Sequence, residues 1–167
     1  QDESTDSNTD STGSATSLVQ DNRVLQIPDD NYRTYYELFV YSFYDSDGDG
    51  IGDLQGVLEK LDYLNDGDDT TDMDLGINGI WLMPVMPSVT YHKYDTTDYE
   101  NIDPQYGTLE TFQELLTACH DRGIRVILDL AMNHSSSSHP WFQQAAEYLK
   151  SLPEGEEPDS SECPYVD

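Results

Sequence analysis

Four aspartates lie within nine residues of one loop, at relative positions one, three, five and nine. The loop has the sequence Asp45-Ser46-Asp47-Gly48-Asp49-Gly50-Ile51-Gly52-Asp53. Carboxylate oxygens at this spacing suit a calcium ion, and the seventh position can add its backbone carbonyl. Four carboxylates this close would repel one another without a cation. We therefore predict a Ca2+ site with the ligands Asp45, Asp47, Asp49, Ile51 and Asp53.

This acidic loop is not an EF-hand. An EF-hand needs a bidentate Glu at position twelve, where this chain has Gly56. An acidic turn without an ion is the alternative reading. None of the predicted ligands is suited to attack a substrate, so we expect the ion to fix the turn between a strand and a helix.

A second group of polar side chains follows two apolar segments. Asp129 and His134 come at and after the end of the segment Arg125–Leu130, and the loop Tyr91–Tyr99 alternates tyrosines with His and Asp. The carboxyl ends of parallel strands are where such folds bind ligands. Tyrosine rings pack on sugar C–H groups, and His and Asp can bond hydroxyls. Taken singly, a strand-end Asp more often caps a turn and a His more often bonds a backbone carbonyl. The combination favours a sugar site.

Three short segments read as the strands that position these groups. Tyr35–Phe43 is aromatic and β-prone, while Gly79–Met83 and Arg125–Leu130 are continuous apolar runs. We expect the second strand to be buried on both faces and the third to be buried as well. Helical patterns separate the strands, which predicts a parallel sheet of right-handed βαβ units.

The predicted helices have clear start signals. Asp53 and Thr108 can each cap a helix, Gly123 can end the second helix, and Pro140 can begin a third. Apolar residues recur at intervals of three and four in each, as expected for one inward face. The first helix would present Leu54, Val57, Leu58, Leu61 and Leu64; the second Leu109, Phe112, Leu115, Leu116 and Cys119; the third Trp141, Phe142, Ala145, Ala146 and Leu149.

The charge balance narrows the range of partners. The chain has 34 acidic and 7 basic residues, a formal net charge of −27, which would repel nucleic acid and anionic lipid. A neutral sugar meets no such repulsion. The sequence has no run of 18 apolar residues, so we predict no transmembrane segment. Residues 1–17 contain twelve Ser, Thr or Asp, so residues 1–30 are predicted to be a disordered acidic tether. A tether suits a secreted or surface-anchored protein; a ragged terminus is the alternative. We expect Cys119 and Cys163 to be unpaired.

The chain resembles the α-amylase family of glycoside hydrolases, glycoside hydrolase family 13, from about Tyr35 to Phe142. The segment Asp129–His134 matches the family's D-x-x-x-N-H motif. Three further matches lie in the family's order: the Asp45–Asp53 loop, Ile80–Pro84 and Tyr91–Asp95. Four ordered matches are far more specific than any one of them.

The resemblance implies roles for individual residues. Tyr94 would stack on the reacting sugar, His92, Asp95 and His134 would bond its hydroxyls, and Asp129 would support the site from within the barrel. Asn133 corresponds to a residue that binds a second calcium in many relatives. One departure stands out, because Lys93 occupies a position that is commonly Gly. We expect Lys93 either to perturb the loop or to lie over the mouth of the subsite.

The implied fold is a (β/α)8 TIM barrel. Residues 31–134 would form its first three strands and two helices, and residues 135–167 would begin an inserted small domain, domain B. A complete barrel takes roughly 250 residues, so we expect more chain to follow, and the remainder of the barrel is a required partner. A three-stranded fragment would otherwise leave an open strand edge and exposed apolar faces.

The implied activity is retaining hydrolysis of α-1,4-glucosidic bonds in starch-like α-glucans or malto-oligosaccharides. The nucleophile and the acid/base would come from the fourth and fifth strands, beyond Asp167, so the 167 residues alone are expected to be inactive. Three alternatives stay open. They are an exo-acting α-glucosidase or oligo-1,6-glucosidase of the same family, a noncatalytic barrel relative that binds carbohydrate, and a free-standing calcium-binding module.

Overall fold

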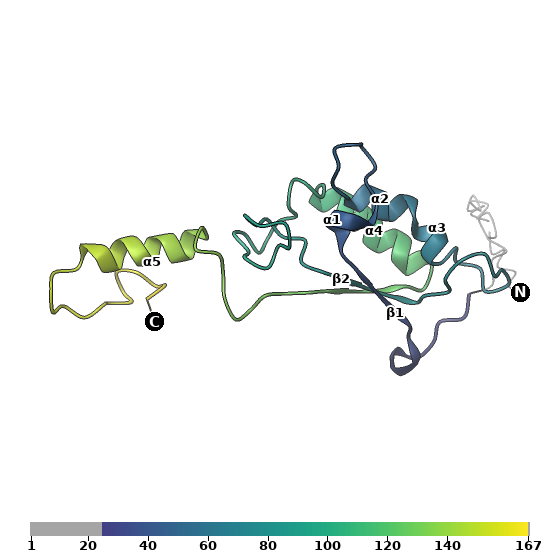
Figure 1. Cartoon of the computed structure of the whole chain (residues 1–167). Coiled ribbons are helices and arrows are strands. Elements are labelled where there is room, and N and C mark those ends of the chain that lie inside the picture. Colours follow the sequence, from purple (N-terminus) through teal and green to yellow (C-terminus); the bar gives the residue numbers. More distant parts are fainter. Residues whose placement is uncertain (1–24, 167) are drawn as a thin grey trace, which may run out of the picture.

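The computed structural model describes residues 25–166, and its centre is a three-stranded parallel sheet (Figure 1). The strands β1 (Tyr35–Leu38), β2 (Gly79–Leu82) and β3 (Arg125–Leu128) lie in the order β1-β2-β3. The strands are in register, so that Leu38, Leu82 and Leu128 are aligned at their carboxyl ends. The predicted parallel sheet is therefore confirmed, and its strand ends meet at one edge.

Three helices cover one face of the sheet (Figure 1): α2 (Leu54–Glu59), α3 (Leu61–Leu64) and α4 (Leu109–Asp121). The predicted caps are present, since the Asp53 side chain accepts from the backbone N–H of Gly56 and the Thr108 side chain from that of Thr111. The core between helices and sheet buries apolar residues from β1, β2 and the three helices: Leu38, Leu54, Val57, Leu61, Leu64, Ile80, Leu82, Leu115 and Cys119.

The predicted first helix is interrupted. Lys60 has φ −106° and ψ 7°, and its backbone N–H bonds to Val57 O, so α2 ends there and α3 begins directly after it. Both short helices still direct their leucines into the core. The spacing of the apolar residues was therefore informative about the buried face but not about the break.

The first strand is shorter than predicted. The sequence favours a strand to Phe43, but β1 ends at Leu38 and a single helical turn, α1 (Val40–Phe43), follows it. The backbone N–H of Gly52 donates to Tyr41 O (2.8 Å), and that of Asp53 donates to Tyr44 O (3.1 Å). These carbonyls are thus used by the acidic loop and not by a neighbouring strand. Tertiary contacts here outweigh the β-propensity of the aromatic residues.

The predictions of buried strands are wrong in part. Trp81 on β2 is 41% exposed, and Ile127 and Leu128 on β3 are 46% and 36% exposed. The reason is geometric, because the helices α2 to α4 cover one face and no described element covers the other (Figure 1). An apolar sheet face of this kind is what parallel sheets normally bury under further elements.

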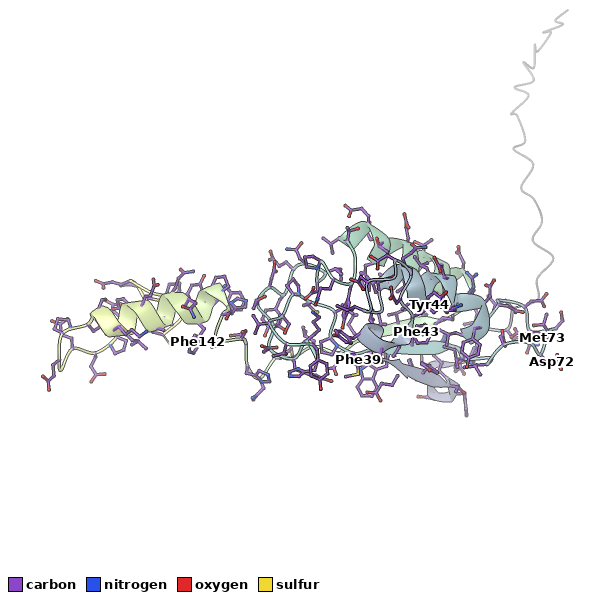
Figure 2. All side chains as sticks on the ribbon, turned by 45° about the horizontal axis from the view of Figure 1, so that its top comes forward. Phe39, Phe43, Tyr44, Asp72, Met73 and Phe142 are labelled. Carbon is purple, nitrogen blue, oxygen red and sulfur yellow. The ribbon has the colours of Figure 1, made fainter. Side chains whose placement is uncertain are left out.

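The last helix, α5 (Pro140–Ser151), begins at Pro140 as predicted. The His139 side chain caps it by accepting from the backbone N–H of Trp141. Figure 2 shows Phe142 on α5, apart from Phe39, Phe43 and Tyr44 in the body of the sheet and helices. No residue of α5 is buried, so its predicted inward face is not in contact with a core among the described residues.

The remaining structural predictions fare differently. Cys119 and Cys163 are both free and buried, which confirms the expectation of unpaired thiols. Burial raises the pKa of the Cys119 thiol to about 12.

No helix among residues 25–166 is long and apolar enough to cross a membrane. Most of the predicted tether, residues 1–24, lies outside the described residues.

Candidate functional site

The structure joins Tyr94 to Asp129 at the carboxyl ends of the strands. The Tyr94 hydroxyl donates to Asp129 Oδ2 at 2.7 Å. Asp129 directly follows β3, and its backbone N–H donates to Leu82 O at the end of β2. Tyr94 lies in the long loop after β2. Two residues that are 35 positions apart in sequence, and that were predicted to share a site, therefore contact each other.

The two predicted histidines lie on either side of Tyr94. The backbone N–H of Tyr94 donates to His92 Nδ1 at 3.2 Å, and His134 Nε2 lies 3.1 Å from Tyr94 O. The rings of His92 and Tyr94 have centroids 5.9 Å apart. Tyr94, Asp129, His92 and His134 thus form one connected group, which we call the tyrosine cluster. It offers a ring face, two imidazoles and a carboxylate to a polar ligand.

Asp95 points to the base of its own loop. Its Oδ1 accepts from the hydroxyls of Ser88 and Thr90. Desolvation raises the pKa of the Asp95 carboxyl, but these two hydrogen bonds outweigh it and hold the pKa below its usual range. The structure therefore shows Asp95 bracing the loop, and its predicted bond to a sugar hydroxyl stays a prediction.

Lys93 does not lie over the mouth of the site. Its side chain is 1% exposed, and its ammonium lies 2.7 Å from both Asp103 Oδ2 and Gln105 Oε1. Its φ of 64° is a left-handed conformation that Gly adopts without strain. Of the two expectations for Lys93, the position over the mouth is therefore wrong, and a perturbed loop stays a prediction. The sequence signal was the replacement of a common Gly, but the partner Asp103, ten residues away, was not foreseen.

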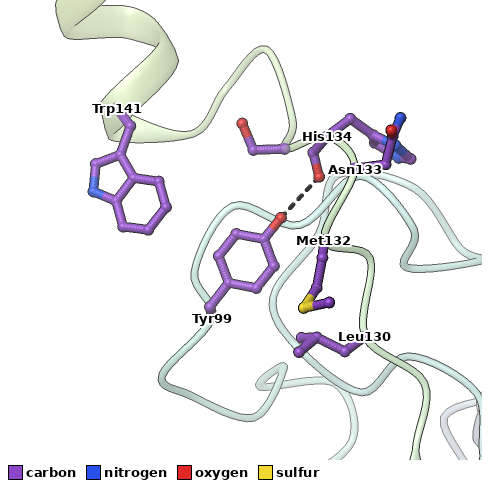
Figure 3. Close-up of a pocket in the computed structure, with 7 residues that line it drawn as sticks. Tyr99, Leu130, Met132, Asn133, His134 and Trp141 are labelled. Carbon is purple, nitrogen blue, oxygen red and sulfur yellow. Dashed lines mark hydrogen bonds between the residues drawn. The ribbon is translucent and has the colours of Figure 1, made fainter. Parts of the chain in front are cut away.

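A pocket of about 510 Å³ adjoins the tyrosine cluster (Figure 3). Its lining includes Tyr99 and Trp141, which sequence reasoning did not single out for this role. The Tyr99 hydroxyl donates to the backbone oxygens of Ala131 and His134 at 2.9 and 2.8 Å, so it fixes the chain after β3. Asn133 also lines this pocket, and its predicted role as a calcium ligand stays a prediction.

The acidic loop brings three of its four aspartates together. Carboxylate oxygens of Asp45, Asp47 and Asp49 all lie within 4.8 Å of one another. Asp45 accepts from the backbone N–H groups of Gly50 (2.8 Å) and Gly48 (2.6 Å), and these bonds hold the pKa of its carboxyl below the usual range. The three aspartates therefore present a compact group of oxygen ligands of the kind that hard cations prefer.

Asp53 is not in this cluster of three. One of its oxygens accepts from the backbone N–H of Gly56 at 2.6 Å, and both contact the Ser46 hydroxyl at 2.8 and 2.9 Å. The structure thus shows its capping role, which the sequence also predicted. Its role as a metal ligand, like that of the Ile51 carbonyl, stays a prediction.

The sequence also matches known proteins over most of its length. The sequence pattern of the family described as alpha amylase, catalytic domain, matches residues 37–163. The chain belongs to the α-amylase family. The matched region contains both the acidic loop and the tyrosine cluster, so the residues that suggested this family lie within the region that establishes it.

Relatives of known structure and sequence agree with this membership. The solved structure of Amy13B from Eubacterium rectale has 63% sequence identity and a TM-score of 0.78, covering 87% of this chain and 27% of that one. Alpha-amylase 3 of Dictyoglomus thermophilum is 52% identical over 67% of this chain and 21% of its own length. A probable oligo-1,6-glucosidase of Bacillus subtilis is 41% identical over 66% of this chain and 18% of its own.

The comparisons also explain the shape of the sheet. The chain spans about a fifth of the length of the curated relatives that it matches. Its structural neighbours include Amy13B and an alpha-amylase from H. orenii, and its parallel sheet with alternating helices is part of a (β/α)8 barrel. The exposed face of β2 and β3 is therefore a face that a barrel fills with side chains from other strands.

The Tyr94–Asp129 bond predicts an abnormal titration. The hydrogen bond to Asp129, followed by desolvation and the carboxylate charge, raises the pKa of Tyr94 to about 12. The bond should therefore stabilise the fold below pH 10, a contribution lost as the pH rises through about 12.

Asp129→Asn is expected to move the pKa of Tyr94 towards 10. The pKa can be measured by NMR of 13Cζ-labelled tyrosine, with Tyr94→Phe to assign the signal. Asp121→Asn, on the exposed end of α4, is the control. An unchanged Tyr94 pKa in Asp129→Asn would contradict the assignment.

Proposed function

We propose that the protein of which this chain is part hydrolyses α-1,4-glucosidic bonds in starch-like glucans with retention of configuration. The observation that supports this most is the tyrosine cluster. It places an aromatic ring, two imidazoles and a strand-end carboxylate together at the edge where parallel α/β folds bind ligands. Membership of the α-amylase family and the names of the relatives add independent support.

In this proposal the chain supplies the binding half of the site. The Tyr94 ring takes the face of one glucose unit, because aromatic rings pack well on the C–H groups of sugars. The Asp129 carboxylate accepts from the Tyr94 hydroxyl and thereby fixes the ring plane. His92 and His134 hold the backbone of Tyr94 from two sides and offer their remaining ring positions to sugar hydroxyls.

Bond cleavage requires two more carboxyl groups. A retaining glycosidase uses a nucleophile and an acid/base roughly 5 Å apart. By the family resemblance these come from the fourth and fifth strands, and Asp129 is neither of them. Asp129 is also already bonded to Tyr94, which makes it a support and not a nucleophile.

We propose in addition that the acidic loop binds Ca2+. The arrangement fits a hard cation, because three carboxylates lie within 4.8 Å in a loop whose turns are closed by backbone bonds to Asp45 and Asp49. Asp45, Asp47 and Asp49 would hold the ion, with the Ile51 carbonyl as a further ligand. When bound, the ion would neutralise the loop and fix the turn that leads into α2.

The second candidate activity is exo-acting α-glucosidase or oligo-1,6-glucosidase. It is favoured by the 41% identity to a probable oligo-1,6-glucosidase.

A location outside the cell, either secreted or anchored at the surface, is also proposed. The Ser-, Thr- and Asp-rich sequence of residues 1–17 supports it, because such a composition is typical of a tether.

A substrate panel separates these activities. The full-length protein is expected to cut maltoheptaose into several product lengths and to leave isomaltose intact, whereas an oligo-1,6-glucosidase would cut isomaltose. Polarimetry or NMR should show α-anomers first, as retention requires. The purified 167-residue chain is expected to show no hydrolysis above a buffer blank. Activity of that chain would contradict the assignment of the missing carboxyl groups, and inactivity of the full-length protein would contradict the proposed function.

A further inference from the structure

A buried lysine lies between the two candidate sugar-binding residues His92 and Tyr94. Lys93 is 1% exposed, whereas its two neighbours are partly exposed. Its ammonium lies 2.7 Å from Asp103 Oδ2 and 2.7 Å from Gln105 Oε1, and 5.0 Å from the ring centroid of Tyr106. Because an unpaired buried charge is very unfavourable, these partners must be in place whenever the loop is folded as it is here.

The backbone at Lys93 adopts a conformation that is unfavourable for a lysine. Its φ is 64°, and among residues 25–166 it is the only residue other than glycine with a positive φ. Such a conformation persists only where the surrounding structure determines it. The loop therefore keeps a side chain at a position suited to Gly, which indicates that the side chain contributes something a Gly cannot.

The partner Asp103 connects Lys93 to the other end of the same loop. Asp103 Oδ2 also accepts from the backbone N–H of Ser88 at 3.2 Å, and the backbone N–H of Asp103 donates to Val85 O at 2.8 Å. The Ser88 hydroxyl in turn donates to Asp95. The buried Asp103, which is 5% exposed, thus joins Lys93 to Ser88, and Ser88 continues the link to Asp95.

We propose that Lys93 is a positioning residue for the sugar site, whose buried ion pair with Asp103 fixes the loop 88–95 so that Tyr94 meets Asp129. The residue touches no substrate. It acts through Tyr94, which follows it directly and whose hydroxyl must reach Asp129 Oδ2. The proposal rests on the proposed function for its effect on substrate, but its effect on Tyr94 can be measured without any substrate.

Two single variants separate the ion pair from the backbone strain. Lys93→Met retains the strain and removes the charge, whereas Lys93→Gly removes both. In the full-length protein, both are expected to raise KM for maltoheptaose about tenfold while kcat changes less than about twofold. Both are also expected to move the Tyr94 pKa from about 12 towards 10, because the bond to Asp129 is no longer held. Lys150→Met, an exposed lysine on α5, is the charge-matched control and should leave both readouts unchanged.

A double variant keeps the test valid if Lys93→Met does not fold. Lys93→Met with Asp103→Asn leaves no buried charge unpaired, so its thermal stability should recover relative to Lys93→Met. Its KM and Tyr94 pKa should stay altered, because the link between the two ends of the loop is still absent. Recovery of KM and of the Tyr94 pKa along with stability would show a merely structural role and overturn the proposal, as would wild-type values of both in Lys93→Gly. Wild-type protein that does not cut maltoheptaose would instead refute the proposed function, and the Tyr94 pKa would still decide the role of Lys93.

Discussion

Replacing Asp129 by Ala in the full-length protein should lower kcat/KM for maltoheptaose by roughly 10- to 150-fold. The estimate follows from the 2.7 Å bond between the Tyr94 hydroxyl and Asp129 Oδ2. A hydrogen bond to a charged group contributes about 1.5–3 kcal/mol, and each 1.4 kcal/mol corresponds to about a factor of ten in rate. The variant leaves the Tyr94 hydroxyl without its partner, next to the ring that is proposed to hold the sugar. Steady-state kinetics on a single maltooligosaccharide measures the effect.

Two further variants show whether the effect passes through Tyr94. Tyr94→Phe removes the same hydrogen bond from the other side but keeps the ring, so it should lose less activity than Asp129→Ala. The loss of transition-state stabilisation, calculated from kcat/KM, should be much smaller in the double variant than the sum of the losses in the two single variants. The reason is that both single variants remove the same interaction. Asp121→Ala, at the exposed end of α4, should retain wild-type kcat/KM. Fully additive losses would show that Asp129 acts independently of Tyr94.

The sequence predicts the sheet well because strands and helices differ in apolar spacing. The apolar segments that include β2 and β3 are short and continuous. In the helices that cover them, apolar residues recur at intervals of three and four. The end of β1 could not be predicted in this way. Its aromatic residues favour a strand, but the carbonyls of Tyr41 and Tyr44 accept from Gly52 and Asp53 of the acidic loop. That choice depends on contacts between segments, which spacing does not show.

The candidate site was predictable where residues lie at strand ends. Asp129 follows β3 and Tyr94 lies in the loop after β2, so parallel pairing alone brings their segments to one edge of the sheet. Lys93 shows the limit of this reasoning. Its position predicted either a perturbed loop or a side chain over the mouth of the subsite, but its partners, Asp103 and Gln105, lie ten and twelve residues further along in an irregular loop. No periodic pattern relates these positions.

The acidic loop was predicted as four carboxylate ligands, and the structure separates them. Asp45, Asp47 and Asp49 cluster, while Asp53 caps α2. Both roles of Asp53 were visible in the sequence, because an Asp before a helical pattern is a common cap. Since α2 begins directly after the loop, an ion bound to the three clustered aspartates would also fix the start of the helix.

Removal of Ca2+ should therefore lower the melting temperature of the full-length protein. A ligand present at 100 times its Kd stabilises the folded state by about 2.7 kcal/mol. For a barrel of roughly 250 residues, each kcal/mol corresponds to about 2–4 °C, so saturation with Ca2+ should raise Tm by roughly 5–10 °C over the EGTA-treated protein. The measurement is differential scanning calorimetry with and without Ca2+. Mg2+ should give a smaller shift, because it is smaller, demands octahedral geometry and dehydrates reluctantly.

Variants of the loop locate this effect. Asp47→Asn should remove most of the Ca2+-dependent shift, because it takes one charged ligand from the cluster of three. Asp72→Asn is the matched control, since Asp72 is an exposed carboxylate in a different acidic loop and its loss changes the net charge by the same amount. The shift should be intact in this control. If Asp47→Asn and Asp72→Asn kept the same Ca2+-dependent Tm, the ion would bind elsewhere, and the cluster of Asp45, Asp47 and Asp49 would be an acidic turn stabilised by its own backbone bonds.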